Sequence, residues 1–176
     1  SMLITSGGRV SSRDATIGDQ PGSSGFVQVT GPNSKWDIPF FLIIDQGELN
    51  ISSGATVNVG FGVYLFNDGR ITGDGTINGQ VVNFGSISPG NSPGVLTING
   101  AYTQVGTIQD LGDVSGRLNL QINGAAPGAY DKLVVNGQAS LGGGLYVDLG
   151  YTPSTTDAFP NVVQTTGGIA KPFDII

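Results

Sequence analysis

Histidine and cysteine are both absent from the 176 residues of the sequence. Without cysteine, neither a disulfide framework nor a thiolate metal site is available. Without histidine, the commonest general base and the commonest metal ligand are missing as well. These absences exclude a serine or cysteine nucleophile that depends on a histidine base, and they exclude metal sites built from imidazole or thiolate ligands.

Charge is also scarce, and positive charge most of all. Only 11% of the residues are charged, against roughly 25% in an average protein. The sequence contains seven lysines and arginines and 13 acidic residues, which gives a formal net charge of −6. Nucleic acids and anionic membrane surfaces bind basic patches, so neither is expected as a partner. The longest apolar run, Phe40 to Ile44, is too short to span a bilayer, so membrane insertion is not expected either.

Glycine is abundant instead, with 30 of the 176 residues against a usual share of about 7%. Apolar residues make up 38% and are spread along the whole chain, whereas a disordered glycine-rich linker lacks such a supply. No window free of glycine and proline has apolar residues at helical spacing. The composition therefore predicts a folded, turn-rich, all-β chain. We expect one domain over residues 1–176, less regular over 1–46 and 125–176.

Most expected strands share one form, in which a glycine stands just before an alternating run of β-branched or aliphatic residues. The form occurs at Gly8, Gly25, Gly47, Gly69, Gly85, Gly94, Gly116 and Gly143. Three intervals are equal in length, from Gly25 to Gly47, from Gly47 to Gly69 and from Gly94 to Gly116, and the others are irregular. A period in the low twenties, with insertions, is typical of a solenoid. At about 3.3 Å per residue, each coil then accommodates two or three short strands and their turns.

The corners of such coils need residues that tolerate a positive φ or that preset φ, and glycine, asparagine and proline meet these needs. The sequence SPGNSPG at 88–94 is then a double corner, with its prolines where no ladder N–H is needed. Asparagines that follow strands are expected to stack as a corner ladder: Asn78, Asn99, Asn123 and Asn136. An antiparallel sandwich, with hairpin turns at 67–69 and 73–75, is the alternative fold.

The segment ISPGNSPGVLTINGAYTQ at 87–104 resembles the strand repeat of autotransporter passenger domains and related bacterial surface proteins. In that family a Ser-Pro-Gly-Asn-Ser-Pro-Gly turn precedes a Leu-Thr-Ile strand and an Asn-Tyr-Thr-Gln-like strand. The segments at 130–149 and 151–176 are similar to the coils that follow in the family, and the segment at 7–36 resembles a second repeat. The sequence departs from the family at Ala101, where a more polar residue is common, and at 105–115, which is less regular.

The resemblance implies a right-handed, single-stranded parallel β-helix, export across the outer membrane and display at the bacterial cell surface. Because residues 173–176 look cut within a strand, we expect a fragment of a longer rod. The expected function is an extracellular structural or adhesive module that is not an enzyme and that binds a protein or carbohydrate partner. Self-association through open coil edges is a further expectation. The alternative is a carbohydrate-active β-helix enzyme or a fragment of a phage tailspike.

No catalytic, cofactor-binding or metal-binding residue is expected. Glycoside hydrolysis needs two facing carboxylates, and the candidates are Asp45, Glu48, Asp68 and Asp74, of which Asp68 and Asp74 flank Arg70. The Asn-Asp-Gly and Gly-Asp-Gly contexts favour turn roles for Asp68 and Asp74. The segment GDGTINGQ at 73–80 matches a calcium-binding repeat only weakly.

Other polar and aromatic residues are candidates for further sites. Three serines are candidate nucleophiles but have no histidine partner: Ser88, Ser92 and Ser115. Four threonines are candidates for an ice-binding face but do not form its Thr-x-Thr pattern: Thr72, Thr76, Thr97 and Thr103. Aromatic residues are expected mainly in the core, but any that point outward form a contact patch: Trp36, Phe61, Tyr64, Phe66, Tyr102, Tyr130, Tyr146 and Tyr151. The run VGFGVYLFND at 59–68 is a candidate for such an apolar strip.

Overall fold

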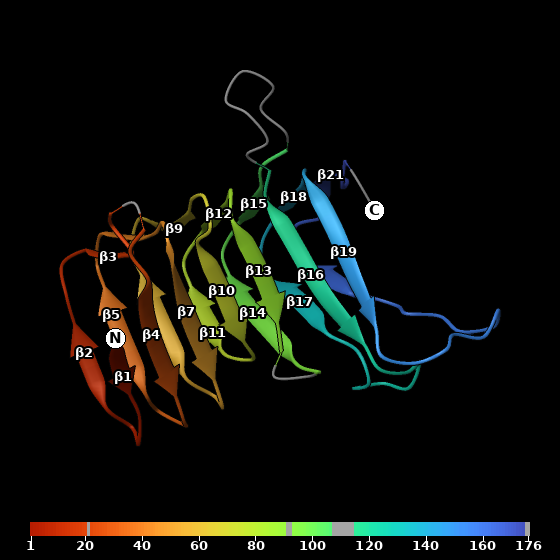
Figure 1. The fold of residues 1–176 in the computed structure, drawn as a ribbon, viewed down its shortest axis with the longest axis horizontal. Coiled ribbons are helices and arrows are strands. Elements are labelled where there is room, and N and C mark those ends of the chain that lie inside the picture. The colour runs from red at the N-terminus through yellow and green to blue at the C-terminus, as the bar shows by residue number, and fades with distance from the viewer. Residues whose placement is uncertain (21, 91–92, 107–114, 175–176) are drawn as a thin grey trace.

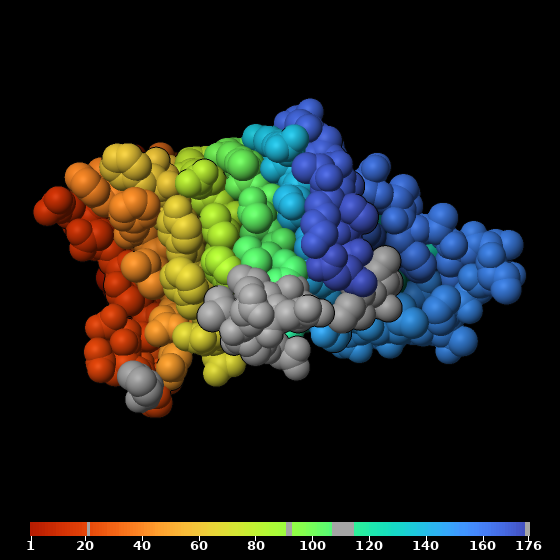
Figure 2. Space-filling view, turned by 90° about the horizontal axis from the view of Figure 1, so that it is seen from above, coloured from red at the N-terminus to blue at the C-terminus, as the bar shows by residue number. Residues whose placement is uncertain are grey.

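The computed structural model describes residues 1–20, 22–90, 93–106 and 115–174 (Figure 1). These residues form 21 β-strands and no helix, and so they include no helix that is long and apolar enough to cross a membrane. The molecule is elongated, with the N-terminal strands toward one end and the C-terminal strands toward the other (Figure 2). The prediction of an all-β chain is confirmed.

The strands form three sheets of seven strands each. The first sheet contains β1 (Met2–Ile4), β4 (Gly25–Thr30), β7 (Gly47–Ser52), β10 (Arg70–Gly73), β13 (Ser86–Pro89), β16 (Arg117–Ile122) and β19 (Gly144–Leu149). The second contains β2 (Arg9–Ser11), β5 (Lys35–Ile38), β8 (Thr56–Val59), β11 (Thr76–Asn78), β14 (Val95–Asn99), β17 (Lys132–Val135) and β20 (Val163–Thr165). The third contains β3 (Ala15–Ile17), β6 (Phe41–Ile44), β9 (Gly62–Leu65), β12 (Val81–Asn83), β15 (Tyr102–Gln104), β18 (Ala139–Leu141) and β21 (Ile169–Lys171).

Each strand pairs in parallel with the strand three places later in the chain. Successive strands therefore belong to different sheets, and we call each set of three, one from each sheet, a coil. Figure 1 shows the strands of the first sheet side by side in chain order. The arrangement is consistent with a solenoid-like parallel β fold. The antiparallel sandwich is wrong, because the paired strands in all three sheets are parallel.

Two of the three equal glycine intervals each correspond to one complete coil, and each begins and ends beside the first sheet. Gly25 pairs directly with Gly47. Glu48 pairs with Arg70, which places Gly69 next to Gly47 at the same corner. The glycine period therefore marks the place where the chain passes from the third sheet into the first.

The third of these intervals is not a coil. Gly94 precedes β14 in the second sheet, whereas Gly116 precedes β16 in the first. A complete coil lies instead in the shorter interval from Gly69 to Gly85. A Cβ atom at Gly85 would lie 2.2 Å from the carbonyl oxygen of Gly69, so stacking at this corner requires glycine.

The core lies inside the three sheets, where alternate side chains of most strands point. The first sheet contributes a row joined by strand register, and each member is at most 7% exposed: Val27, Leu49, Ile71, Ile87 and Leu118. Burying one side chain of this kind stabilises the fold by about 1.5–3 kcal/mol. Because inward and outward positions alternate, every outward position of a strand faces solvent or a neighbouring coil's outward side chain.

Three polar side chains interrupt the core beneath the third sheet. Tyr102 Oη donates a hydrogen bond to Gln104 Oε1 (2.7 Å) and accepts one from Asn83 Nδ2 (3.2 Å). Asn83 Nδ2 also donates to the carbonyl oxygen of Arg117 (3.1 Å), and Gln104 Nε2 donates to that of Gly144 (3.0 Å). The three side chains, each at most 1% exposed, thus hold the first residues of β16 and β19.

An amide ladder runs along the outer face of the second sheet. Each asparagine donates a hydrogen bond of 2.5–2.7 Å to the residue one coil earlier, in the order Asn136, Asn99, Asn78 and Asn58, and the carboxylate of Asp37 accepts the last one. The predicted stacking is confirmed for Asn78, Asn99 and Asn136. It is wrong for Asn123, which follows β16 in the first sheet and is outside the ladder.

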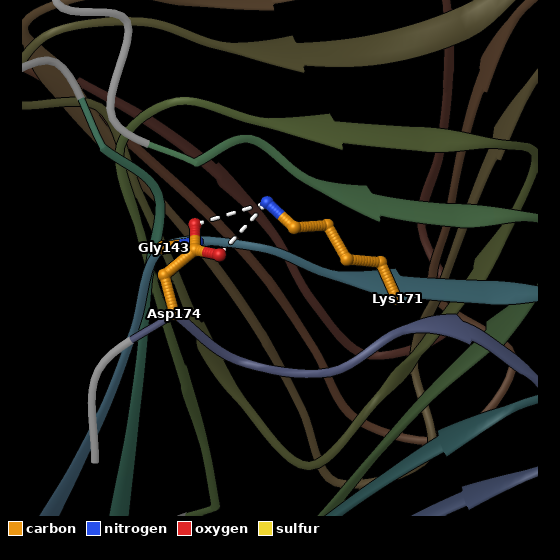
Figure 3. Close-up of polar contacts among 3 residues, drawn as sticks. All are labelled: Gly143, Lys171 and Asp174. Carbon is orange, nitrogen blue, oxygen red and sulfur yellow. Dashed lines mark hydrogen bonds and ion pairs between the residues drawn. The ribbon is translucent and has the colours of Figure 1, made fainter.

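A tether fixes the C-terminal end of the described chain (Figure 3). Asp174 forms an ion pair with Lys171 Nζ (2.8 Å) and accepts a hydrogen bond from the backbone N–H of Gly143 (2.8 Å). The hydrogen bond from Lys171 has the largest effect and that from Gly143 the next largest, and together they hold the pKa of Asp174 below its ordinary value. The segment after β21 is therefore held against the corner that precedes β19.

Candidate functional site: a trough on the first sheet

The outer face of the first sheet is hollowed along β13. The outward residues of β13 are serines, and the neighbouring strands carry longer side chains: Ser86 and Ser88 lie between Arg70 and Thr72 of β10 and Arg117 and Asn119 of β16. Two hollows, of about 1010 Å³ and about 460 Å³, share Ser88 and Asn119 as lining residues. They adjoin each other, and we call them together the trough. Most of its lining residues are placed by the register of β10, β13, β16 and β19, and others, such as Asp68 and Asp131, lie in the adjoining turns.

The wider hollow contains two arginines. Arg70 and Arg117 both pair with Ser86, so their strands lie two strand spacings apart, about 9.6 Å. The guanidinium of Arg117 lies 5.7 Å from the ring centroid of Tyr146. Within the described residues, neither guanidinium takes part in a hydrogen bond or an ion pair. Asp68 lines the same hollow, which therefore contains charged donors and a charged acceptor.

The narrower hollow contains an exposed aromatic ring beside a carboxylate. Tyr146 and Asp148 are outward residues of β19 and both line this hollow. The Tyr146 side chain is 46% exposed. At the boundary between the two hollows, Asn119 Nδ2 donates a hydrogen bond to Ser88 Oγ (3.2 Å). Ring, carboxylate, amide and hydroxyl thus follow one another within a short distance along the trough.

Asp131 anchors one wall of the trough. Its Oδ1 accepts the backbone N–H of Gly94, and its Oδ2 accepts that of Gln121, each at 2.8 Å. Burial raises the pKa of Asp131, and the hydrogen bonds from Gln121 and Gly94 oppose this rise. Gly90 lies so close that a Cβ atom there would be 2.3 Å from Asp131 Oδ1. The carboxylate therefore ties the segment before β14 to β16.

The acidic residues singled out in the sequence are only partly brought together. A hollow of about 410 Å³ beside the trough is lined in part by Glu48, Asp68 and Arg70. Asp45 follows β6 of the third sheet and accepts a hydrogen bond from Asn67. Asp74 accepts the backbone N–H of Ser53 (2.8 Å), a turn role. In the described ranges, no group of three or more acidic side chains is placed to hold a metal ion.

The hydroxyl candidates are spread over all three sheets. Ser88 lies in the trough floor, Ser115 lines the wider hollow, and Ser92 lies outside the described residues. Thr72 belongs to the first sheet and Thr103 to the third. On the second sheet, three threonines pair in register beside the amide ladder, and their pattern is Thr-x-Asn: Thr56, Thr76 and Thr97.

A strip of six aromatic rings crosses the outer side of the third sheet and its corners: Phe40, Phe41, Phe61, Tyr64, Phe66 and Phe84. Neighbouring centroids lie 5.3–6.4 Å apart. Phe61 is 55% exposed and Phe41 is 42% exposed, so the run at 59–68 does contribute outward rings. Tyr64, Phe66 and Phe84 stack at interplanar angles of 11° and 18°, so their faces are turned toward one another.

The remaining aromatic candidates have different surroundings. Trp36, Tyr102 and Tyr130 are buried, and the Tyr151 hydroxyl donates a hydrogen bond to Asp157 (2.9 Å). Among the predicted aromatic residues, Tyr146 is the one that lines the trough. Sequence reasoning missed Arg117, Asn119 and Asp148 as lining residues, although their outward positions in alternating strands were a usable signal.

No protein-family model, curated protein or solved structure matches the chain.

The trough combines guanidinium and amide donors, carboxylate acceptors and hydroxyls that both donate and accept. Such a set makes hydrogen bonds to ligands that carry several hydroxyl groups.

Proposed function

We propose that the chain is a structural and adhesive module of a secreted or surface-displayed bacterial protein, similar to an autotransporter passenger domain. The observation that carries the proposal is the trough, a hollow lined mainly by residues on strands β10, β13, β16 and β19 of one regular sheet and completed by residues of the adjoining turns. A site held by strand register is formed before its ligand arrives, so little free energy is spent on ordering it. A rigid scaffold with a shaped polar face is suited to binding rather than to conformational signalling.

In this proposal the three sheets form a right-handed, single-stranded parallel β-helix. Connections between parallel strands of one sheet are right-handed in about 98% of cases, which supports the handedness. The edge strands are β1, β2 and β3 at one end and β19, β20 and β21 at the other. Edge strands are templates for further pairing, which supports a segment of a longer rod. The resemblance at 87–104 supports a place outside the cell.

A carbohydrate-active enzyme is the alternative, because Asp131 and Asp148 line the same hollow. Asp131 is only 4% exposed, and both of its oxygens accept backbone hydrogen bonds. A carboxylate held in this way is an anchor, whereas a general acid or base must reach the scissile bond. We therefore favour binding without turnover.

The test is an adhesion assay with a product assay beside it. The protein is applied to immobilised cell-surface glycans and cell-surface proteins, and retained protein and released fragments are measured together. We expect retention on at least one of these surfaces and no released fragment. Release of sugar fragments that stops in Asp148→Asn, but not in the control Asp74→Asn at another exposed aspartate, would establish the enzyme instead.

A further inference from the structure

We infer that the trough binds a neutral oligosaccharide, a short chain of uncharged pyranose units lying along β13. The inference rests on the proposed adhesive function and names the chemistry of its partner. It is carried by the donors and acceptors of the trough, the exposed ring of Tyr146, the charge balance of the lining and the length of the hollow.

Each sugar hydroxyl both donates and accepts a hydrogen bond, so a sugar site needs donors and acceptors next to each other. In the wider hollow, the guanidinium of Arg117 is a donor and the carboxylate of Asp68 is an acceptor. At the centre, the amide of Asn119 and the hydroxyl of Ser88 provide both functions. Neither guanidinium takes part in a hydrogen bond or an ion pair with the described residues, and that of Arg117 lies over the ring of Tyr146. Their N–H groups can therefore bind neighbouring hydroxyls.

The ring of Tyr146 adds an apolar surface to this polar lining. A pyranose presents C–H groups on the faces of its ring, and these pack on an aromatic ring as other apolar surface does. Tyr146 is 46% exposed and lies in the narrower hollow. The aromatic strip on the third sheet is less suited to this contact, because three of its rings stack on one another.

The charge balance of the lining favours a neutral ligand over an acidic one. The wider hollow is lined by Arg70, Arg117 and Asp68, and the narrower one by Asp131 and Asp148. The trough as a whole thus contains three acidic side chains and two arginines. Glu48, which is the register neighbour of Arg70, adds a further negative charge. The whole chain carries a formal net charge of −6. A uronic acid or a sulfated sugar is therefore repelled on approach.

The length of the trough favours an oligosaccharide over a single sugar. The wider hollow is lined by Ser86 and the narrower one by Pro89, which are the two ends of β13. At about 3.3 Å per residue this is about 10 Å along the strand, and both hollows extend beyond it. The combined hollow thus exceeds the size of one pyranose ring.

The experiment is a calorimetric titration of the 176-residue protein with four trisaccharides. Maltotriose, cellotriose and methyl-esterified trigalacturonate are the neutral probes, and free trigalacturonate is the acidic counterpart of the third. We expect at least one neutral probe to bind. For the trigalacturonate pair, we expect the free acid to bind about tenfold more weakly than the ester at low ionic strength, with the difference shrinking as salt screens the repulsion.

Two variants in the trough and one control variant outside it locate the site. Ser88→Tyr fills the floor of the trough and should abolish binding, whereas Ser140→Tyr, at an outward position of β18 on the third sheet, should leave binding unchanged. Tyr146→Ala should weaken binding about tenfold through loss of the ring contact. Thermal unfolding of each variant confirms that it is folded. Both tyrosine variants add the same side chain to an outward strand position, so they are matched.

Three results would overturn the inference. The first is that the free acid binds as tightly as its ester at low salt. The second is that Ser88→Tyr binds as the wild type does. The third is that no neutral probe binds although the protein is retained on immobilised surface proteins; the adhesive function would then stand without a sugar partner. Absence of retention on every surface would defeat the adhesive function itself.

Discussion

The buried hydroxyl of Tyr102 is a sensitive probe of how the coils are held together. Its side chain is 1% exposed, and Oη bonds to Gln104 at 2.7 Å and to Asn83 at 3.2 Å. A buried hydrogen bond contributes about 1 kcal/mol net. Tyr102→Phe keeps the ring and removes both hydrogen bonds, so we expect the free energy of unfolding at pH 7 to fall by about 2 kcal/mol.

The same hydroxyl has a pH signature. Burial raises the pKa of Tyr102 well above the ordinary value of 10.0, and the hydrogen bond from Asn83 lowers it by less. Above pH 10 the unfolded chain has released this proton and the folded chain has not, so the unfolded state binds fewer protons. Wild-type stability therefore falls by about 1.4 kcal/mol per pH unit from this group. The Tyr102→Phe variant has no hydroxyl proton to release, so its stability does not change with this titration. The difference of about 2 kcal/mol in free energy of unfolding between wild type and variant therefore disappears within about two pH units above 10.

Urea unfolding followed by tryptophan fluorescence measures both effects, because Trp36 is the single tryptophan and is 4% exposed. Tyr64→Phe is the matched control at pH 7, since Tyr64 lies in the outer strip, and its stability should change by less than about 0.5 kcal/mol. The reasoning is refuted if Tyr102→Phe is as stable as the wild type at pH 7, or if the gap stays constant from pH 7 to pH 11.

Three further predictions concern other contacts. Asn78→Ala breaks two rungs of the amide ladder and should lower the free energy of unfolding by about 1 kcal/mol, whereas Asn123→Ala should change it by less than about 0.5 kcal/mol; equal losses in urea titrations would contradict the ladder. Asp131→Ala removes the acceptor of the Gly94 and Gln121 N–H groups, so hydrogen exchange at these two amides should speed up while that of Ile77 in the core does not, and unchanged exchange at both would contradict the anchor. Because the pKa of Asp174 is lowered from 3.8, its ion pair adds stability above that pH and loses it as the pH falls below; Lys171→Met should therefore lower the melting temperature at pH 7 but not at pH 2, and an equal loss at both would contradict the tether.

The coil architecture could be predicted from local signals in the sequence. Gly25, Gly47 and Gly69 recur at a constant interval because each stands at the same corner of successive coils. Asn78 and Asn99 follow strands of equivalent position and therefore stack. In both cases one residue type repeats at one place in the coil, and such a repeat is visible without knowing which strands pair.

The prediction failed where coil length changes. The interval from Gly94 to Gly116 equals the period by coincidence, since the two glycines precede strands of different sheets. The interval from Gly69 to Gly85 is shorter than the period and therefore looks irregular in the sequence, although it is a complete coil. Corners gain or lose residues without disturbing the strands, so interval length alone does not identify equivalent positions.

The sequence could indicate which residues point outward, but the trough itself could not be predicted, because it depends on which outward residues become neighbours. Ser86 pairs with Arg70, which precedes it in the chain, and with Arg117, which follows it at a much greater separation in sequence. These unequal separations follow no pattern in the sequence. The aromatic strip was predictable in part: its centre lies in the run at 59–68, whereas Phe41 and Phe84 join it only through the stacking of coils.

The parallel register is tested most directly by engineered disulfides, since the natural sequence contains no cysteine. Thr76 pairs with Thr97 on the outer face of the second sheet, so Thr76→Cys with Thr97→Cys should form a disulfide readily under mild oxidation. The control pair, Thr76→Cys with Asn99→Cys, is displaced along the strand to the next outward position, which separates the Cα atoms by about 8 Å, beyond the reach of a disulfide bond. Non-reducing electrophoresis after a short protease digest should show fragments linked in the first pair and free in the second. Preferential linkage of 76 to 99, which an antiparallel pairing with Ile77 opposite Ile98 would produce, would contradict the stacked parallel coils.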